Sequence, residues 1–233
     1  LLLALMIWIS PLPEIDLAGE GSEKSRSGVA RTSIFQFPHL LLGVFCIFVY
    51  VGVEVMSGDV IGTYGRSLGM SLDITKNFTS YTLWSMVVGY VIGVITIPKI
   101  IKQEDALKIA SVLALVFVVL AFVTHGYMSI LFIALLGLAN SVMWPAIFPM
   151  AIDGLGAFTK IGSAFLIMGI AGGAVIPQVY ARLTDVVSPQ LAFFICLLPC
   201  YLYILYYSAS GYRAGRHKSG ERSPELEPAS LTS

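Results

Sequence analysis

Charged residues are scarce in this chain. Asp, Glu, Lys and Arg together make up 12% of the 233 residues, roughly half of the share found in a typical soluble domain. Hydrophobic residues make up 57%, which is more apolar surface than a soluble core can hide, so the surplus is expected to face lipid. The formal net charge is zero, which gives no indication of a nucleic-acid partner. The composition therefore predicts a membrane protein.

Motifs for metals, cofactors and enzymes are also missing. The sequence has three cysteines and three histidines, and none of them stand at the spacing of a metal site. It contains no HExxH motif and no P-loop, so we expect no metal, no cofactor and no enzymatic activity. One enzymatic alternative stays open, in which Asp59 or Glu54 acts as an acid or base. It would need a second catalytic group at the same depth, and Asp153 is expected at the opposite, cytoplasmic side.

Six long apolar segments predict an all-α membrane protein. Each has about the length that a helix needs to cross a bilayer, and the apolar runs are continuous, which favours helices over barrel strands. The segments span residues 39–61, 78–98, 106–123, 128–152, 161–181 and 191–208. The opening run 1–9 is too short to cross, and we interpret it as the end of a helix. We predict a polar linker at 10–37, a six-helix unit at 38–210 and a disordered tail at 211–233.

The basic residues predict how the helices are oriented. Eleven of the fourteen Lys and Arg residues fall on the side that holds the linker, the connections 98–108 and 153–160, and the tail. Basic residues stay in the cytoplasm, so the linker and the C-terminus are expected inside. A long cytoplasmic linker before six helices with both ends inside is typical of one half of a transporter built from two six-helix halves.

Glu54 is the main polar residue where lipid is expected. It stands inside the first apolar segment, and Tyr50 precedes it by one turn on the same face, close enough for the phenol to reach the carboxyl. Ionisable groups within membrane spans are costly and need a partner or a function. We expect Glu54 to accept hydrogen bonds from a ligand or to act as a protonatable switch. The alternative is a structural carboxyl bonded to a neighbouring helix.

Three further segments place polar or aromatic residues at a similar depth. Asn140 and Trp144 lie one turn apart, with Pro145 and Pro149 expected to bend the helix after them. Trp84 and Gln178 come from the second and fifth segments. Together these residues could line a cavity for a neutral, hydroxyl-rich ligand. For Asn140 and Trp144, an interhelical hydrogen bond and a packing role stay open as alternatives.

The motifs themselves resemble a known family. The segments are YVGVEVMSGD at 50–59, WPAIF at 144–148 with GLG at 154–156, and GSA at 162–164 with GGAVIP at 172–177. Taken together they resemble the fucose:proton symporter family of the major facilitator superfamily, and within it the glucose/galactose transporter branch. The resemblance covers about residues 35–210, which would be helices seven to twelve, with residues 1–9 as the end of helix six.

This resemblance implies a twelve-helix, two-half fold that works by alternating access in the inner membrane of a bacterium. It implies symport of a neutral hexose with a proton or sodium ion, in a pocket shared with an N-terminal six-helix half. The family's carboxylates tied to proton coupling lie in that first half. We expect Glu54, Tyr50, Trp84, Asn140, Trp144 and Gln178 to bind the sugar. The alternative is a non-transporting assembly or regulatory fragment.

Overall fold

The computed structural model describes residues 33–97 and 99–215, and within them all the regular structure is helical. Six helical stretches among these residues are long and apolar enough to cross a membrane. They run over Pro38–Gly58, Leu72–Thr96, Gln103–Val123, Tyr127–Ile152, Gly156–Leu183 and Pro189–Ala209. The predicted all-α membrane fold is confirmed. The predicted helix end at 1–9, most of the linker and most of the tail lie outside the described residues.

The first span is the single helix α2, Pro38–Gly58. Its continuous apolar sequence suits a helix that satisfies every backbone group internally, as the membrane interior requires. Proline at the first position costs no hydrogen bond there. We predicted that this segment would reach residue 61, but α2 ends at Gly58, where the sequence turns polar with Asp59. The short helices α3 (Ile61–Ser67) and α4 (Leu72–Thr75) then lead to α5 (Phe78–Thr96).

The fourth span is broken in two. After α6 (Gln103–Val123), the chain forms α7 (Tyr127–Asn140) and then α8 (Met143–Ile152). The break at Ser141 and Val142 has a clear cause in Pro145. That proline has no N–H to donate to the Ser141 carbonyl four residues earlier, and its ring crowds that carbonyl. The predicted bend is therefore present, and it begins one turn before the proline.

The fifth span is also interrupted, and glycines let it pack tightly. It consists of α9 (Thr159–Met168), the short 3-10 turn η4 (Gly169–Ala171) and α10 (Gly172–Leu183). A Cβ atom on Gly172 would overlap the backbone carbonyl of Phe48 in α2. Small residues permit this close approach of two helices. The last span is α11 (Pro189–Ala209).

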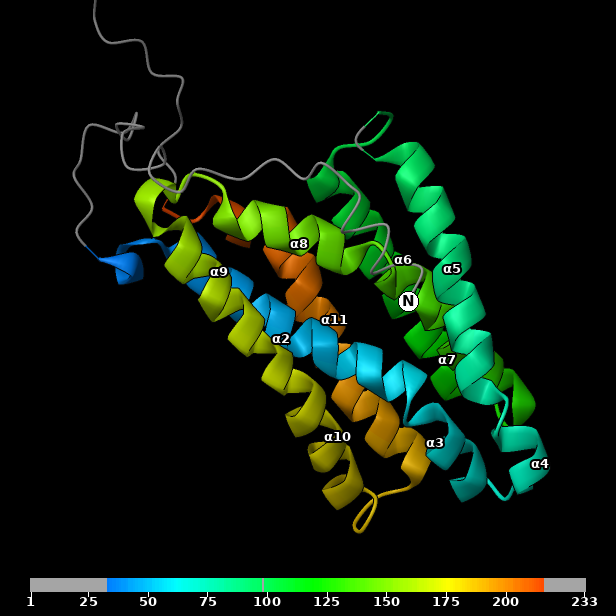
Figure 1. Ribbon diagram of the computed structural model, residues 1–233. Coiled ribbons are helices and arrows are strands. Elements are labelled where there is room, and N and C mark those ends of the chain that lie inside the picture. The colour runs from blue at the N-terminus through cyan, green and yellow to red at the C-terminus, as the bar shows by residue number, and fades with distance from the viewer. Residues whose placement is uncertain (1–32, 98, 216–233) are drawn as a thin grey trace, which may run out of the picture.

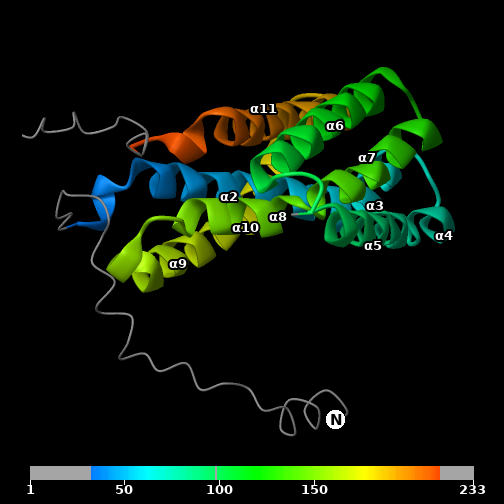
Figure 2. The same cartoon turned by 90° about the horizontal axis from the view of Figure 1, so that it is seen from above.

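Helix α2 lies at the centre of the arrangement. It packs against α10, α11, α8 and α7. Figures 1 and 2 show α6 and α11 on one side of α2, with α9 and α10 on the other. The α7–α8 break faces this central helix, because both α7 and α8 contact it. Side chains from α2 and from the break are thus brought together.

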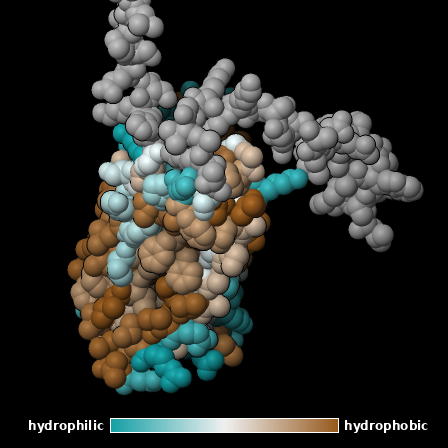
Figure 3. Space-filling view, turned by 90° about the vertical axis from the view of Figure 1, so that its left-hand side faces the viewer, coloured by the Kyte–Doolittle hydropathy of each residue, from teal (hydrophilic) through white to brown (hydrophobic). Residues whose placement is uncertain are grey.

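The surface matches a bilayer environment. Large apolar side chains are exposed along α5, α6, α9, α10 and α11. In the view of Figure 3, apolar residues cover a broad band, and hydrophilic residues gather at its lower end. So large an exposed apolar surface is not found on a soluble monomer, and here it is covered by lipid or by further protein.

Candidate functional site

Glu54 is a carboxylate within the first span, surrounded by apolar residues of α2. Its side chain is half-buried, so part of it remains accessible. Tyr50, one turn earlier, is buried, and its hydroxyl lies close enough to the Glu54 carboxyl to interact with it. The contact expected from the spacing of these two residues is present. The pair combines a partly accessible acceptor with a buried phenol one turn away on the same helix.

Trp144 adds an aromatic surface beside this pair. Its ring lies 6.2 Å from the ring of Tyr50, measured between centroids, with an angle of 54° between the planes. Phe148, one turn further along α8, lies nearly parallel to the indole, with 6.1 Å between ring centroids. Trp144 is half-buried. The indole is therefore fixed by two neighbouring rings while part of its surface stays open.

Asn140 stands at the last position of α7, and its side chain is 0% exposed. Its amide nitrogen donates to the Ser57 hydroxyl at 3.0 Å, and its carbonyl oxygen accepts from the Tyr201 hydroxyl at 2.9 Å. Ser57 in turn donates to the backbone carbonyl of Glu54 at 3.0 Å. These bonds connect α7 with α2 and α11 at the level of Glu54.

A fourth helix joins the same network. The Thr82 hydroxyl of α5 donates to the backbone carbonyl of Ser57 at 2.8 Å. All four polar side chains of the network, Ser57, Thr82, Asn140 and Tyr201, are buried. Buried polar groups that satisfy one another rigidify a helix bundle and specify its arrangement. The network therefore holds Glu54 in a defined position relative to α5, α7 and α11.

Sequence reasoning missed three residues near Glu54. Tyr90 of α5 and Tyr201 of α11 lie close enough to Glu54 to interact with it electrostatically, and Ser57 bonds to its backbone. The two tyrosines could have been noticed in the sequence, because each stands in the middle of an apolar span. A phenol that is buried there needs a polar partner. We call the following seven residues the central cluster: Tyr50, Glu54, Ser57, Tyr90, Asn140, Trp144 and Tyr201.

Two of the predicted binding residues do not join the central cluster. Trp84 is 69% exposed and lies about 120° around α5 from Tyr90, which approaches Glu54. Gln178 is exposed on α10 and lies about 200° around that helix from Ile176, which packs on Gly52 of α2. Both side chains point away from the helices that carry the cluster. Their role in binding stays a prediction.

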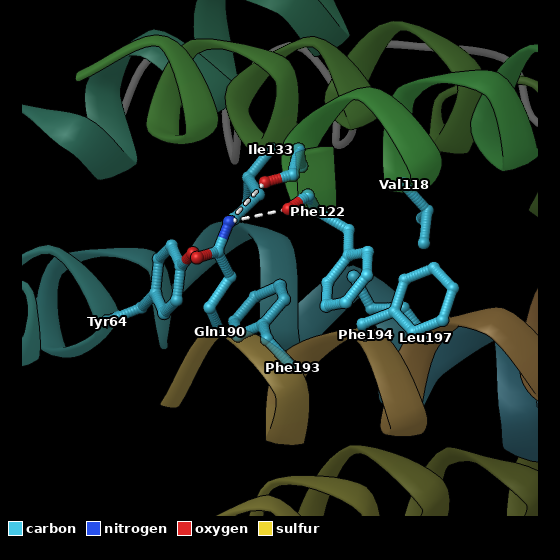
Figure 4. Close-up of a pocket in the computed structure, with 9 residues that line it drawn as sticks. Tyr64, Val118, Phe122, Ile133, Gln190, Phe193, Phe194 and Leu197 are labelled. Atoms are coloured by element: carbon cyan, nitrogen blue, oxygen red, sulfur yellow. Dashed lines mark hydrogen bonds between the residues drawn. The ribbon is translucent and has the colours of Figure 1, made fainter. Parts of the chain in front are cut away.

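A separate small cavity lies between α6 and α11 (Figure 4). It measures about 10 Å³ and is lined mostly by aromatic and aliphatic residues, which is room for a single water at most. The Gln190 amide in its wall donates to the carbonyls of Ala121, Phe122 and Thr124 at 2.7–3.0 Å. These are carbonyls at the end of α6 that the helix itself leaves unpaired. Gln190 thus caps the end of α6 in the wall of this cavity, and the cavity is too small to be a binding site.

Beside this cavity, Tyr64 of α3 shares a hydrogen bond of 2.9 Å with Ser129. Tyr64 lies outside the six spans. Burial raises its pKa, although the bond to Ser129 acts in the opposite direction. The phenol therefore stays neutral and serves to pack the connection between the first and second spans.

Residues 33–97 and 99–215 contain no group of three His, Cys, Asp or Glu residues that could hold a metal ion. The central cluster offers one carboxylate, several hydroxyl groups and aromatic surface. Such a set can bind a neutral ligand with several hydroxyl groups, because the carboxylate accepts from hydroxyls and the rings cover apolar faces.

No protein-family model matches the sequence. Curated relatives do match it over most of its length. The glucose/galactose transporter of Brucella abortus biovar 1 (strain 9-941) is 31% identical over 215 residues, which is 91% of this chain and 51% of the relative. A putative glucose/galactose transporter of Helicobacter pylori (strain ATCC 700392 / 26695) is 28% identical over 219 residues, again covering 91% of the chain. The chain is a homologue of these transporters.

The relationship extends to the L-fucose-proton symporter of Escherichia coli (strain K12), which is 24% identical over 188 residues. Among solved structures, the outward conformation of the major facilitator superfamily transporter FucP matches with a TM-score of 0.74. The identity is 22%, and the match covers 90% of this chain and 51% of FucP. The chain thus has the fold of half a major facilitator transporter, and it spans about half the length of the curated relatives it matches. These relatives are transporters and not enzymes, which confirms the expectation that the protein is not an enzyme.

Proposed function

We propose that the full-length protein carries neutral hexoses across the membrane, and that this chain supplies the C-terminal half of the sugar site. The observation that supports this most is the central cluster. A half-buried carboxylate, Glu54, and a half-buried indole, Trp144, both neighbour Tyr50 in the middle of a helix bundle of the major facilitator fold. The relatives named as glucose/galactose transporters and L-fucose-proton symporters point to the same class of substrate.

In this proposal, Glu54 accepts hydrogen bonds from sugar hydroxyls, which are stronger for a charged acceptor than for a neutral one. The exposed part of Trp144 covers an apolar face of the sugar ring. Tyr50 orients the carboxyl from its own helix. Asn140 has both ends of its amide engaged with Ser57 and Tyr201, so we assign it to hold the cluster together rather than to contact the sugar directly.

The proposal needs a second six-helix half to close the site. Glu54 and Trp144 are each open on one side, and the apolar faces of α5 and α10 beside them are exposed. We propose that an N-terminal half covers this side, that the two halves alternate access, and that the coupling ion is a proton or sodium. Trp84 and Gln178 are exposed on α5 and α10, so in this proposal they would reach the sugar only from the side that the N-terminal half covers. We place the protein in the bacterial inner membrane, with the C-terminus in the cytoplasm.

Transport is tested by measuring uptake of a panel of labelled hexoses. Cells that lack their own hexose transporters would express the full-length protein, with and without an uncoupler that collapses the proton gradient. We expect accumulation of at least one neutral hexose, and loss of accumulation when the driving gradient is removed. A sodium-free buffer distinguishes the two coupling ions. Absence of uptake for every sugar, with the protein present in the membrane, would favour the non-transporting alternative.

A further inference from the structure

A second apolar hollow lies between α5, α6 and α7. It is a groove of about 130 Å³. Its lining is aliphatic apart from one hydroxyl, that of Thr96, which donates to the carbonyl of Ile92 in its own helix. Two of its wall residues, Ile92 and Ile109, are more than half exposed. The groove is therefore open at the surface, and it offers a ligand no polar group.

Glycine and alanine residues form the floor of this groove. Gly89 and Gly93 of α5 line it, and they lie directly against Ser141 and Val142 in the break between α7 and α8. Ala110 of α6 and Ala139 of α7 are buried beneath it. Small side chains at three meeting helices leave a depression that a thin, flexible apolar chain can enter.

Lysines gather where the groove reaches the end of the spans. Ile97 and Ile101 line this end, and the exposed Lys99 and Lys102 belong to the same connection. Within the described residues, the salt bridges of the second and third spans join Lys76 to Asp73 and Lys108 to Asp105, so neither involves Lys99 or Lys102. Glu104 and Asp105 stand in the first turn of α6, where the helix dipole favours a negative charge.

We propose that this groove binds one acyl chain of an anionic phospholipid whose phosphate lies against Lys99 and Lys102. The aliphatic lining fits the acyl chain, and the two exposed ammonium groups fit the headgroup. Basic residues beside a cleft between membrane helices are the chemical signature of an anionic lipid site. The site does not depend on sugar transport, because the groove shares no residue with the central cluster.

Native mass spectrometry of the full-length protein in detergent tests the headgroup contact. We expect bound phosphatidylglycerol to exceed bound phosphatidylcholine. The double variant Lys99→Gln/Lys102→Gln should lose most of this preference, with a reduction of about fivefold for each lysine. The matched control is Lys76→Gln, which removes an exposed lysine from the connection beside α4 and should leave the preference unchanged. Equal binding of both lipids, or an unchanged preference in the double variant, would overturn the proposal.

The acyl chain contact needs a second variant. Ile109→Trp fills the groove from its exposed wall and should weaken binding of both lipids. Val116→Trp is the control, because it lies two turns further along nearly the same face of α6, is also exposed and does not line the groove. A photoreactive amino acid at position 109 should form a cross-link to lipid. A cross-link to protein instead, or lipid binding unaffected by Ile109→Trp, would show that no acyl chain occupies the groove.

Discussion

The hydroxyl of Tyr201 in α11 donates a hydrogen bond of 2.9 Å to the side-chain oxygen of Asn140 in α7. The two residues are 61 positions apart in the sequence, and both are fully buried. Asn140 uses its amide nitrogen for Ser57 in α2, so a single side chain joins three helices. This junction lies at the end of α7, where the fourth span breaks. It fixes the helices that carry the proposed sugar site.

Tyr201→Phe should destabilise the protein. The change leaves the buried oxygen of Asn140 without its donor, and hydrogen bonds between membrane helices contribute about 0.6 kcal/mol on average and about 1.7 at most. Tyr206→Phe is the matched control, because Tyr206 belongs to the same helix and is half-exposed. Thermal unfolding of the full-length protein in detergent is the measurement. Equal melting temperatures for the two variants would mean that the bond contributes nothing.

A substitution at Gly172 should disturb the packing of α10 on α2. In Gly172→Ala, the new methyl group would overlap the carbonyl of Phe48, and overpacking of this kind costs about 1–3 kcal/mol. Gly58→Ala is the control, since a Cβ atom there meets no atom within 4 Å. We expect a lower melting temperature, or less folded protein in the membrane, only for Gly172→Ala. If both variants match the parent protein, the two helices lie further apart than described.

Trp144→Ala should weaken sugar binding about tenfold, because an aromatic contact contributes about 0.5–1.5 kcal/mol beyond the area it buries. Trp144→Phe keeps part of the platform and should lose less. Trp84→Ala and Gln178→Ala should have smaller effects than Trp144→Ala, because neither side chain joins the central cluster. Equilibrium binding of the sugar that the uptake panel identifies is the measurement. A larger effect at Trp84 would place the sugar against α5 rather than α8.

The sequence was sufficient for features that depend on neighbouring residues. Apolar length predicted the six spans, Pro145 predicted the bend in the fourth, and the spacing of Tyr50 and Glu54 predicted their contact. Each of these follows from the local geometry of one helix. Helix α2 ended three residues earlier than expected because hydrophobicity alone does not show where a helix stops.

Contacts between helices could not be read in the same way. Position along a helix gives depth in the membrane, but it does not give the direction in which the side chain points. Trp84 and Gln178 were grouped with Glu54 by depth, yet both lie on faces turned away from it. Tyr201 was missed for the complementary reason, because its partner Asn140 comes from another helix. Only the packing of α2, α7 and α11 brings the two together.

Binding of the transported sugar to the purified full-length protein, measured by titration calorimetry for Glu54→Gln, tests the central claim most directly. Asp59→Asn is the matched control, because Asp59 is an exposed carboxylate at the end of the same helix. Hydrogen bonds to a charged group contribute about 1.5–3 kcal/mol. The account predicts that Glu54→Gln binds sugar about tenfold to a hundredfold more weakly, while Asp59→Asn binds it normally. Unchanged affinity in Glu54→Gln would contradict the proposed sugar site.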